Sequence, residues 1–246
     1  MQNSECSRTR RCCAISRGWN SRGEHLRFCA VVFETGGDHS ELRTTLLSVA
    51  RQSLPPASVV VVIQPAVAGS PDPPPLADPP LSPLRVAYGN LANHLLEEAA
   101  DAFAFLHAGS GWLPPRLEHD DAVLRNGGTM AVLSLPLLVH GKGEFCRVPR
   151  DPFPVTTTAE GFEWVAGEAV VGGIDGLDAG ALLDCLSVRR DLLLPQLQRE
   201  DPSILPALWR GLKHGGTVRF SERCLTNLVI TPTLRPWPPG EPGAGT

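Results

Sequence analysis

The spacing of apolar and polar positions predicts a strand, a helix and a second strand near the start of the chain. Residues 28–33 (FCAVVF) form a continuous β-rich run, which is typical of a strand buried on both faces. In residues 40–52, apolar positions from Leu42 to Ala50 recur with helical spacing, and residues 58–63 end in five consecutive β-branched residues. Such a βαβ unit predicts parallel central strands.

Further elements are predicted beyond a proline-rich stretch. Residues 65–83 contain eight prolines, which excludes a regular helix or an interior strand there and predicts a stiff surface loop. The pattern then predicts helices at 90–100, through Leu117 and Leu124, and at 203–213, and strands at 102–106, 129–135, 182–188 and 217–220. His119-Asp120-Asp121 resembles a set of metal ligands, but we expect a solvated helix there, on which adjacent residues face different ways.

Composition divides the chain into one domain and two tails. A length of 246 residues with 42% hydrophobic residues is enough for one well-packed domain, which we place at 26–235. We expect residues 1–25 to form a basic, disordered tail and residues 236–246 to form a tail rich in proline and glycine. The globular domain is expected to be of the α/β class because helical and strand patterns alternate.

Charge and cysteine usage exclude several classes of protein. A net charge of −4 argues against a nucleic-acid partner, which needs a basic face. No apolar run approaches the length of a transmembrane segment, and the N-terminus lacks the apolar core of a secretory signal. The seven cysteines form no CxxC pair, so we expect reduced thiols and a cytoplasmic protein.

Common catalytic and nucleotide-binding motifs are missing. No G-x-G-x-x-G follows the first strand, and no G-x-S-x-G occurs. Gly141-Lys142-Gly143 lacks the remaining residues of a phosphate-binding loop.

Four segments, in order, resemble the family 2 glycosyltransferases, which have the GT-A fold. They are VVFETGGDHSELRTTLLSVARQSLPP (31–56), VVVVIQP (59–65), AFLHAGSGWLPPRLE (104–118), and LSVRRDLLL (186–194) followed by REDPSILPALWRGLKHGGTVRF (199–220). The third segment is the most specific, since it is similar to A-F-L-D-A-D-D-x-W-L-P-x-x-L-E. The resemblance implies a Rossmann-like nucleotide-diphospho-sugar transferase domain with a mostly parallel central sheet.

The resemblance also implies where a nucleotide-sugar donor would bind. The corresponding positions are Thr35 after the first strand, Gln64 after the second, Asn90 before the next helix, and His107 in the third segment. Thr35, Gln64 and His107 belong to the carboxyl ends of predicted parallel strands, where open α/β sheets bind ligands.

The chain departs from the family pattern where acidic residues are expected. Gln64 and Pro65 stand in place of a carboxylate that contacts the uracil or ribose, and His107-Ala108-Gly109 stands in place of the metal-binding Asp-x-Asp motif. We therefore expect no divalent cation, with Mn²⁺ or Mg²⁺ bound only if ligands come from outside that motif. Arg189, Arg190, Arg210 or Lys213 could replace the missing positive charge if they face the cleft.

Three interpretations of His107 remain open. It could bind a softer ion such as Mn²⁺ or Zn²⁺ through its imidazole, or it could, when protonated, pair with the diphosphate in place of the metal. Alternatively, His107 could be what remains of a decayed site at a strand end.

Glu200 and Asp201 keep the acidic pair that the family uses for catalysis. The resemblance implies that Asp201 is the general base for an acceptor hydroxyl group, with Glu200 as its substitute. The alternative is a surface pair that begins the next helix, where the helix dipole favours acidic residues.

Two functions follow from these expectations. The first is inverting, metal-independent transfer of a sugar from a nucleotide-sugar donor to a hydroxyl group of a sugar, lipid-linked or small-molecule acceptor. The second is a catalytically inactive pseudoenzyme that keeps the GT-A fold as a binding or assembly module.

Overall fold

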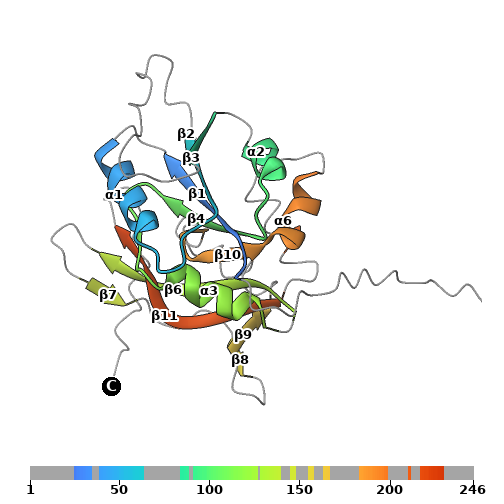
Figure 1. The fold of residues 1–246 in the computed structure, drawn as a ribbon. Coiled ribbons are helices and arrows are strands. Elements are labelled where there is room, and N and C mark those ends of the chain that lie inside the picture. Colours follow the sequence, from blue (N-terminus) through green and yellow to red (C-terminus); the bar gives the residue numbers. More distant parts are fainter. Residues whose placement is uncertain are drawn as a thin grey trace, which may run out of the picture.

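The computed structural model describes eleven segments of the chain (Figure 1). They are residues 25–34, 39–63, 84–88, 91–126, 128–139, 145–147, 155–157, 163–166, 183–198, 210–211 and 217–229. All structural statements below refer to these residues.

The first elements form the predicted strand–helix–strand unit. Strand β1 (Phe28–Glu34), helix α1 (His39–Ala50) and strand β2 (Ser58–Ile63) follow one another, and β1 pairs with β2 in parallel. A further parallel strand, β3 (Leu84–Tyr88), pairs with the outer side of β2. The continuous apolar runs of β1 and β2 are explained by their position inside the sheet, where helices cover both faces.

The remaining elements extend this sheet on the other side of β1. In chain order they are α2 (Leu91–Glu97), β4 (Ala102–His107), β5 (Gly111–Trp112), α3 (Arg116–Leu124), β6 (Thr129–Val139), β7 (Phe145–Arg147), β8 (Val155–Thr157), β9 (Glu163–Ala166), β10 (Leu186–Arg189), α6 (Arg190–Leu197) and β11 (Thr217–Val229).

One sheet contains all of these strands, and nine of them lie side by side in the order β3-β2-β1-β4-β10-β6-β11-β9-β8. Of the other two, β5 pairs with β11 and β7 pairs with β6. Strands β3, β2, β1 and β4 run parallel to one another, and β10 runs antiparallel to both β4 and β6. Strand β6 therefore points in the same direction as the first four, and β11 is parallel to β6. The central sheet is mostly parallel, as predicted.

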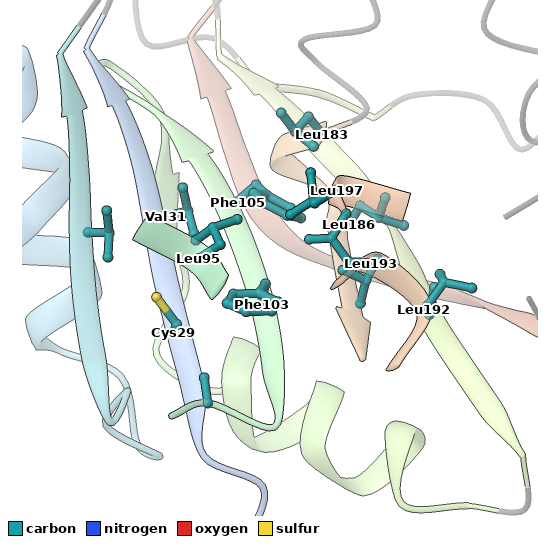
Figure 2. Close-up of a cluster of buried hydrophobic side chains, with 14 of the residues drawn as sticks. Cys29, Val31, Leu95, Phe103, Phe105, Leu183, Leu186, Leu192, Leu193 and Leu197 are labelled. Carbon is teal, nitrogen blue, oxygen red and sulfur yellow. The ribbon is translucent and has the colours of Figure 1, made fainter. Parts of the chain in front are cut away.

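Two apolar layers cover the sheet. One layer joins α1 and α3 to the strand face that contains Ala30, Val32 and Leu106. The other joins α2 and α6 to the opposite face, where Leu95 of α2 and Leu193 of α6 pack near Phe103 (Figure 2). Alternate residues of β1 and β4 thus enter different layers, as the two-residue period of a strand requires.

The observed elements extend the predicted ones in several places. Strands β6 and β11 continue well beyond the predicted 129–135 and 217–220, and β3, β5, β7, β8 and β9 were not predicted. The predicted strand 182–188 begins only at Leu186, after a helical turn at residues 183–184. Of the predicted helix 203–213, residues 210–211 are described, and both are helical. Both tails and the proline-rich stretch 65–83 lie outside the described residues.

The expectation of a solvated α3 is wrong. Asp120 and Asp121 are 0% and 1% exposed, because one side of α3 packs against the sheet. Asp121 accepts hydrogen bonds from the Leu26 N–H group (2.8 Å) and contacts His25 Nδ1 (2.6 Å), while Asp120 contacts Arg116. Each carboxylate thus contacts a different neighbour, and among the described residues the two belong to no group of three or more possible metal ligands.

Candidate functional site

Strands β1, β2 and β4 end together at one edge of the sheet. In the strand register, Glu34 at the end of β1 lies opposite Ile63 at the end of β2, and Phe33 lies opposite His107 at the end of β4. This is the edge at which open parallel sheets bind ligands. Figure 1 shows the ends of these strands side by side.

Residues 107–110 form a tight turn at the end of β4. The Ala108 N–H group donates to the Phe33 carbonyl oxygen (2.8 Å), and the Ser110 N–H group donates to the His107 carbonyl oxygen (3.1 Å). Gly109 has a φ of 90°, a backbone conformation that residues other than glycine rarely adopt. The turn therefore depends on a glycine at the third position of the His107-Ala108-Gly109 segment.

Helix α1 holds this turn from one face of the sheet. The Thr45 hydroxyl group accepts a hydrogen bond from the Gly109 N–H group (3.1 Å) and donates one to the Ser110 carbonyl oxygen (2.7 Å). A Cβ atom on Gly109 would lie 3.3 Å from Oε2 of Glu41, so the Glu41 carboxylate lies against the turn. Thr45 and Glu41 belong to the Glu41-Leu42…Thr45-Leu46 spacing that carried part of the sequence resemblance.

His107 is held on the other face by an acid that the sequence analysis did not identify. Asp184 Oδ1 accepts a hydrogen bond from the His107 N–H group (2.8 Å) and lies 2.5 Å from His107 Nδ1. The imidazole also stacks on Phe33, with ring centroids 5.0 Å apart. The Asp184 side chain is 3% exposed and the His107 side chain 27% exposed, so the ring lies between a buried carboxylate and the solvent.

The direction of β10 explains why Asp184 reaches His107. Ser187 of β10 pairs with Ala104 of β4 in an antiparallel register. Continuing that register to the end of β4 brings residue 184 opposite residue 107. One signal in the sequence points to Asp184: it is a single acid in the apolar run ALLDCLSV (181–188), and a buried carboxylate needs a partner.

A buried polar network lies behind Asp184. Arg116 of α3 is 0% exposed, pairs with Asp120 (2.6 Å) and donates to the Asp184 carbonyl oxygen (3.5 Å). It also contacts the hydroxyl groups of Thr226 and Ser187. This network joins α3, β10 and β11 beneath the turn that carries Asp184.

Burial determines the protonation state of the Cys29 thiol, which lies at the opposite end of β1. Desolvation raises the pKa of Cys29 to about 12, with smaller opposing effects from Ser58 and Arg85. The thiol therefore stays protonated at neutral pH. Cys29 and Cys185 are both buried, and neither forms a disulfide.

The structure locates one of the predicted site residues. His107 lies at the predicted strand edge, whereas Thr35, Gln64, Asn90, Glu200 and Asp201 lie outside the described residues. They therefore remain predictions.

Two of the arginines considered as substitutes for the metal, Arg189 and Arg190, lie away from His107. Arg189 pairs with Ala102 at the start of β4, at the edge opposite His107. Arg190 contacts the carbonyl oxygens of Leu96, Glu98 and Ala100 and so caps the end of α2. Arg210 contacts the Gln196 carbonyl oxygen, and Lys213 is outside the described residues. Arg189 and Arg190 do not replace a cation at the candidate site.

The described residues at the candidate site do not fit a divalent cation. At the position of the Asp-x-Asp motif, Ala108 and Gly109 offer no side-chain ligand, and His107 Nδ1 is engaged by Asp184. Within the described segments, no group of three or more His, Cys, Asp or Glu side chains converges. Mg²⁺ and Mn²⁺ prefer several oxygen ligands, which this arrangement does not supply.

The fold matches solved glycosyltransferase structures. No protein-family model matches the sequence, and the comparison with curated proteins gave no match. Residues 1–349 of S. aureus TarS in complex with UDP-GlcNAc match with a TM-score of 0.53 and 14% identity, over 84% of this chain and 59% of TarS 1–349. The complex with UDP matches with a TM-score of 0.53 and 15% identity, over 84% of this chain and 61% of that one.

The chain thus spans about three fifths of the TarS fragment, and 37% of the longer TarS structure. At this identity the match concerns the fold. None of the described helices is long and apolar enough to span a membrane. The chain has the GT-A fold that the four sequence segments predicted.

Proposed function

We propose that this protein is a glycosyltransferase that binds a nucleotide-sugar donor at the edge formed by the ends of β1, β2 and β4. The observation that carries the proposal is the position of the His107 turn. This turn ends β4 beside the end of β1, where the resemblance to the family 2 glycosyltransferases implies that the diphosphate binds. TarS, whose fold is similar, was solved in complex with UDP-GlcNAc. UDP-GlcNAc is therefore the first donor to test.

In this proposal His107 takes the place of the divalent cation. The breaking bond between the sugar and the diphosphate leaves negative charge on a phosphate oxygen, and a fixed positive group there lowers the barrier. A protonated imidazole supplies one positive charge and an N–H donor. The ring is positioned by Asp184 and Phe33, which supports this role.

In this proposal the acidic pair, Glu200 and Asp201, supplies the general base. The acceptor hydroxyl oxygen attacks the anomeric carbon, Asp201 takes the hydroxyl proton, and the nucleoside diphosphate leaves with the electrons of the broken bond. Glu200 is the substitute base. This assignment rests on the sequence resemblance and gives inversion at the anomeric carbon.

A transfer assay tests the proposal. Wild-type protein is incubated with UDP-GlcNAc or another nucleotide sugar and a panel of acceptors, and release of the nucleoside diphosphate is measured. Asp201→Asn should abolish release and leave donor affinity unchanged, because it removes the base alone. Asp191→Asn, which removes an exposed carboxylate on α6, is the matched control and should retain activity.

A non-catalytic binding module remains the second candidate. It is favoured by the replacement of the acidic positions by Gln64, Pro65 and His107. Donor binding by the wild-type protein, without release of the nucleoside diphosphate in the presence of any acceptor, would support it. Absence of binding for every nucleotide sugar would refute the proposed donor site.

A further inference from the structure

Asp184 is a buried acid to which the sequence resemblance gives no role. Its side chain is 3% exposed, and it lies at the same edge as His107. Burying a carboxylate is costly unless charged or hydrogen-bonding partners compensate. Among the described residues, His107 makes both hydrogen-bonding contacts with this carboxylate, since the His107 N–H group and Nδ1 both meet Asp184 Oδ1.

The contact with Asp184 bears on which nitrogen of His107 carries a proton. An ionised carboxylate only accepts hydrogen bonds, so the nitrogen that faces it, Nδ1, carries a proton. Nε2, across the ring, is then the nitrogen that gains or loses the second proton. A neighbouring carboxylate favours the form in which both nitrogens are protonated.

We propose that Asp184 is the positioning residue that holds His107 in its Nδ1-protonated form and favours the positively charged ring, which then binds the donor diphosphate without a cation. The part of this inference that concerns the diphosphate rests on the proposed function. The part that concerns the protonation of the ring rests on the contact between Asp184 and His107. Because the carboxylate lies behind the ring, a phosphate at Nε2 is closer to the positive charge than to Asp184.

Three other charged side chains described near the turn, those of Glu34, Glu41 and Arg116, do not face the His107 ring. Glu34 follows Phe33 on β1 and so points to the opposite face of the sheet from Phe33 and His107. The Glu41 carboxylate lies against Gly109, on the α1 side. Arg116 contacts the Asp184 backbone carbonyl oxygen rather than its carboxylate. Of these four side chains, that of Asp184 is hydrogen-bonded to the ring.

Nitrogen-15 NMR of the histidine rings tests the role of Asp184 without any ligand. The His107 signals are assigned by comparison with His107→Gln and are followed from about pH 5 to about pH 9, a range that spans the usual histidine titration. We expect Nδ1 to stay protonated throughout and Nε2 to titrate. A wild-type ring with an unprotonated Nδ1 at high pH would overturn the proposal, even if no variant folds.

The Asp184→Asn variant removes the negative charge of residue 184 and keeps the shape of its side chain. Its amide oxygen can still accept from the His107 N–H group, but the negative charge is gone. We expect the Nε2 titration midpoint to fall by about one pH unit, with Asp191→Asn on α6 as the matched control. An unchanged midpoint in Asp184→Asn would overturn the proposal.

Measuring the affinity for UDP in EDTA tests whether the effect of Asp184 on His107 also changes binding of the donor diphosphate. At about pH 7.5, Asp184→Asn should bind UDP roughly tenfold more weakly than wild type. The difference in affinity should shrink at about pH 5.5, where the His107 ring is charged in both proteins. An equal affinity at both pH values would overturn the link between Asp184 and the diphosphate. A wild-type protein that binds no UDP refutes the proposed function, and the NMR titration still decides whether Asp184 controls the ring.

Discussion

Thr45 of α1 donates a hydrogen bond of 2.7 Å to the carbonyl oxygen of Ser110, in the turn that follows β4. The same hydroxyl group accepts from the Gly109 N–H group, and the Thr45 side chain is fully buried. One side chain therefore joins the first helix of the sheet to the turn at the candidate site. This contact gives a structural reason for the threonine in the Glu-Leu-x-x-Thr-Leu spacing of α1.

We expect Thr45→Val to destabilise the protein by about 1–3 kcal/mol. Valine has nearly the same shape but leaves the Ser110 carbonyl oxygen and the Gly109 N–H group without this partner. Urea unfolding measures the effect, and Thr45→Ser, which keeps the hydroxyl group, should lose less. Equal stability of wild type and Thr45→Val would show that the turn does not depend on this contact.

Two glycines with positive φ provide a matched pair for the turn. Gly109 (φ 90°) and Gly128 (φ 82°) have similar backbone conformations that would be strained for an L side chain, but a Cβ atom would meet Glu41 only at Gly109. Alanine at either position should cost about 1–2 kcal/mol, with Gly109→Ala the more costly. Adding Glu41→Ala to Gly109→Ala should remove the excess in unfolding experiments. If the excess persists, the Glu41 contact is not its cause.

The buried Arg116–Asp120 pair should be sensitive to loss of one partner. We expect Arg116→Met to destabilise the protein by about 3–5 kcal/mol, since Asp120 is left as a buried charge. Arg116→Met combined with Asp120→Leu should recover part of the loss, as measured by chemical unfolding.

The exposed pair Arg27–Asp101 is the control for this experiment. Its side chains are 60% and 40% exposed, so Arg27→Met should cost less than about 1 kcal/mol. Similar losses for Arg27→Met and Arg116→Met would contradict the importance that we give to burial.

His119 should make the folded protein less stable in acid. Desolvation lowers the pKa of His119, an effect that Arg223 and Arg116 reinforce and Asp120 opposes. Below a pH of about 6.5 the unfolded chain then binds more protons than the folded one, so stability falls as the pH drops through this range. His119→Gln should flatten the dependence of the unfolding free energy between about pH 7 and about pH 5. An equally steep dependence in the variant would contradict this.

The sequence predicted the parallel half of the sheet well. The apolar runs of β1, β2 and β4 are continuous because both strand faces are buried, and α1 shows a clear apolar face. Strand β3 was missed because its LRVAY segment (84–88) follows the proline-rich stretch and mixes polar with apolar residues. The short strands β7, β8 and β9 depend on pairing with distant partners, which local pattern does not reveal.

The candidate site was only partly predictable. The position of His107 followed from intact flanking residues in the segment 104–118. Asp184 was missed because its contact depends on the antiparallel direction of β10, and the apolar run around it predicted a strand. Asp120 and Asp121 were placed in solvent because charged residues are usually exposed, but their partners Arg116, Leu26 and His25 allow them to be buried.

Titration of the protein with UDP, once in EDTA and once in Mn²⁺, tests the central claim most directly. The claim is that a histidine at the end of β4 replaces the divalent cation of the donor site. It predicts saturable UDP binding whose affinity agrees within about twofold under the two conditions and falls at least about tenfold in His107→Ala. Binding that appears only with Mn²⁺, or that is unchanged in His107→Ala, would contradict the claim.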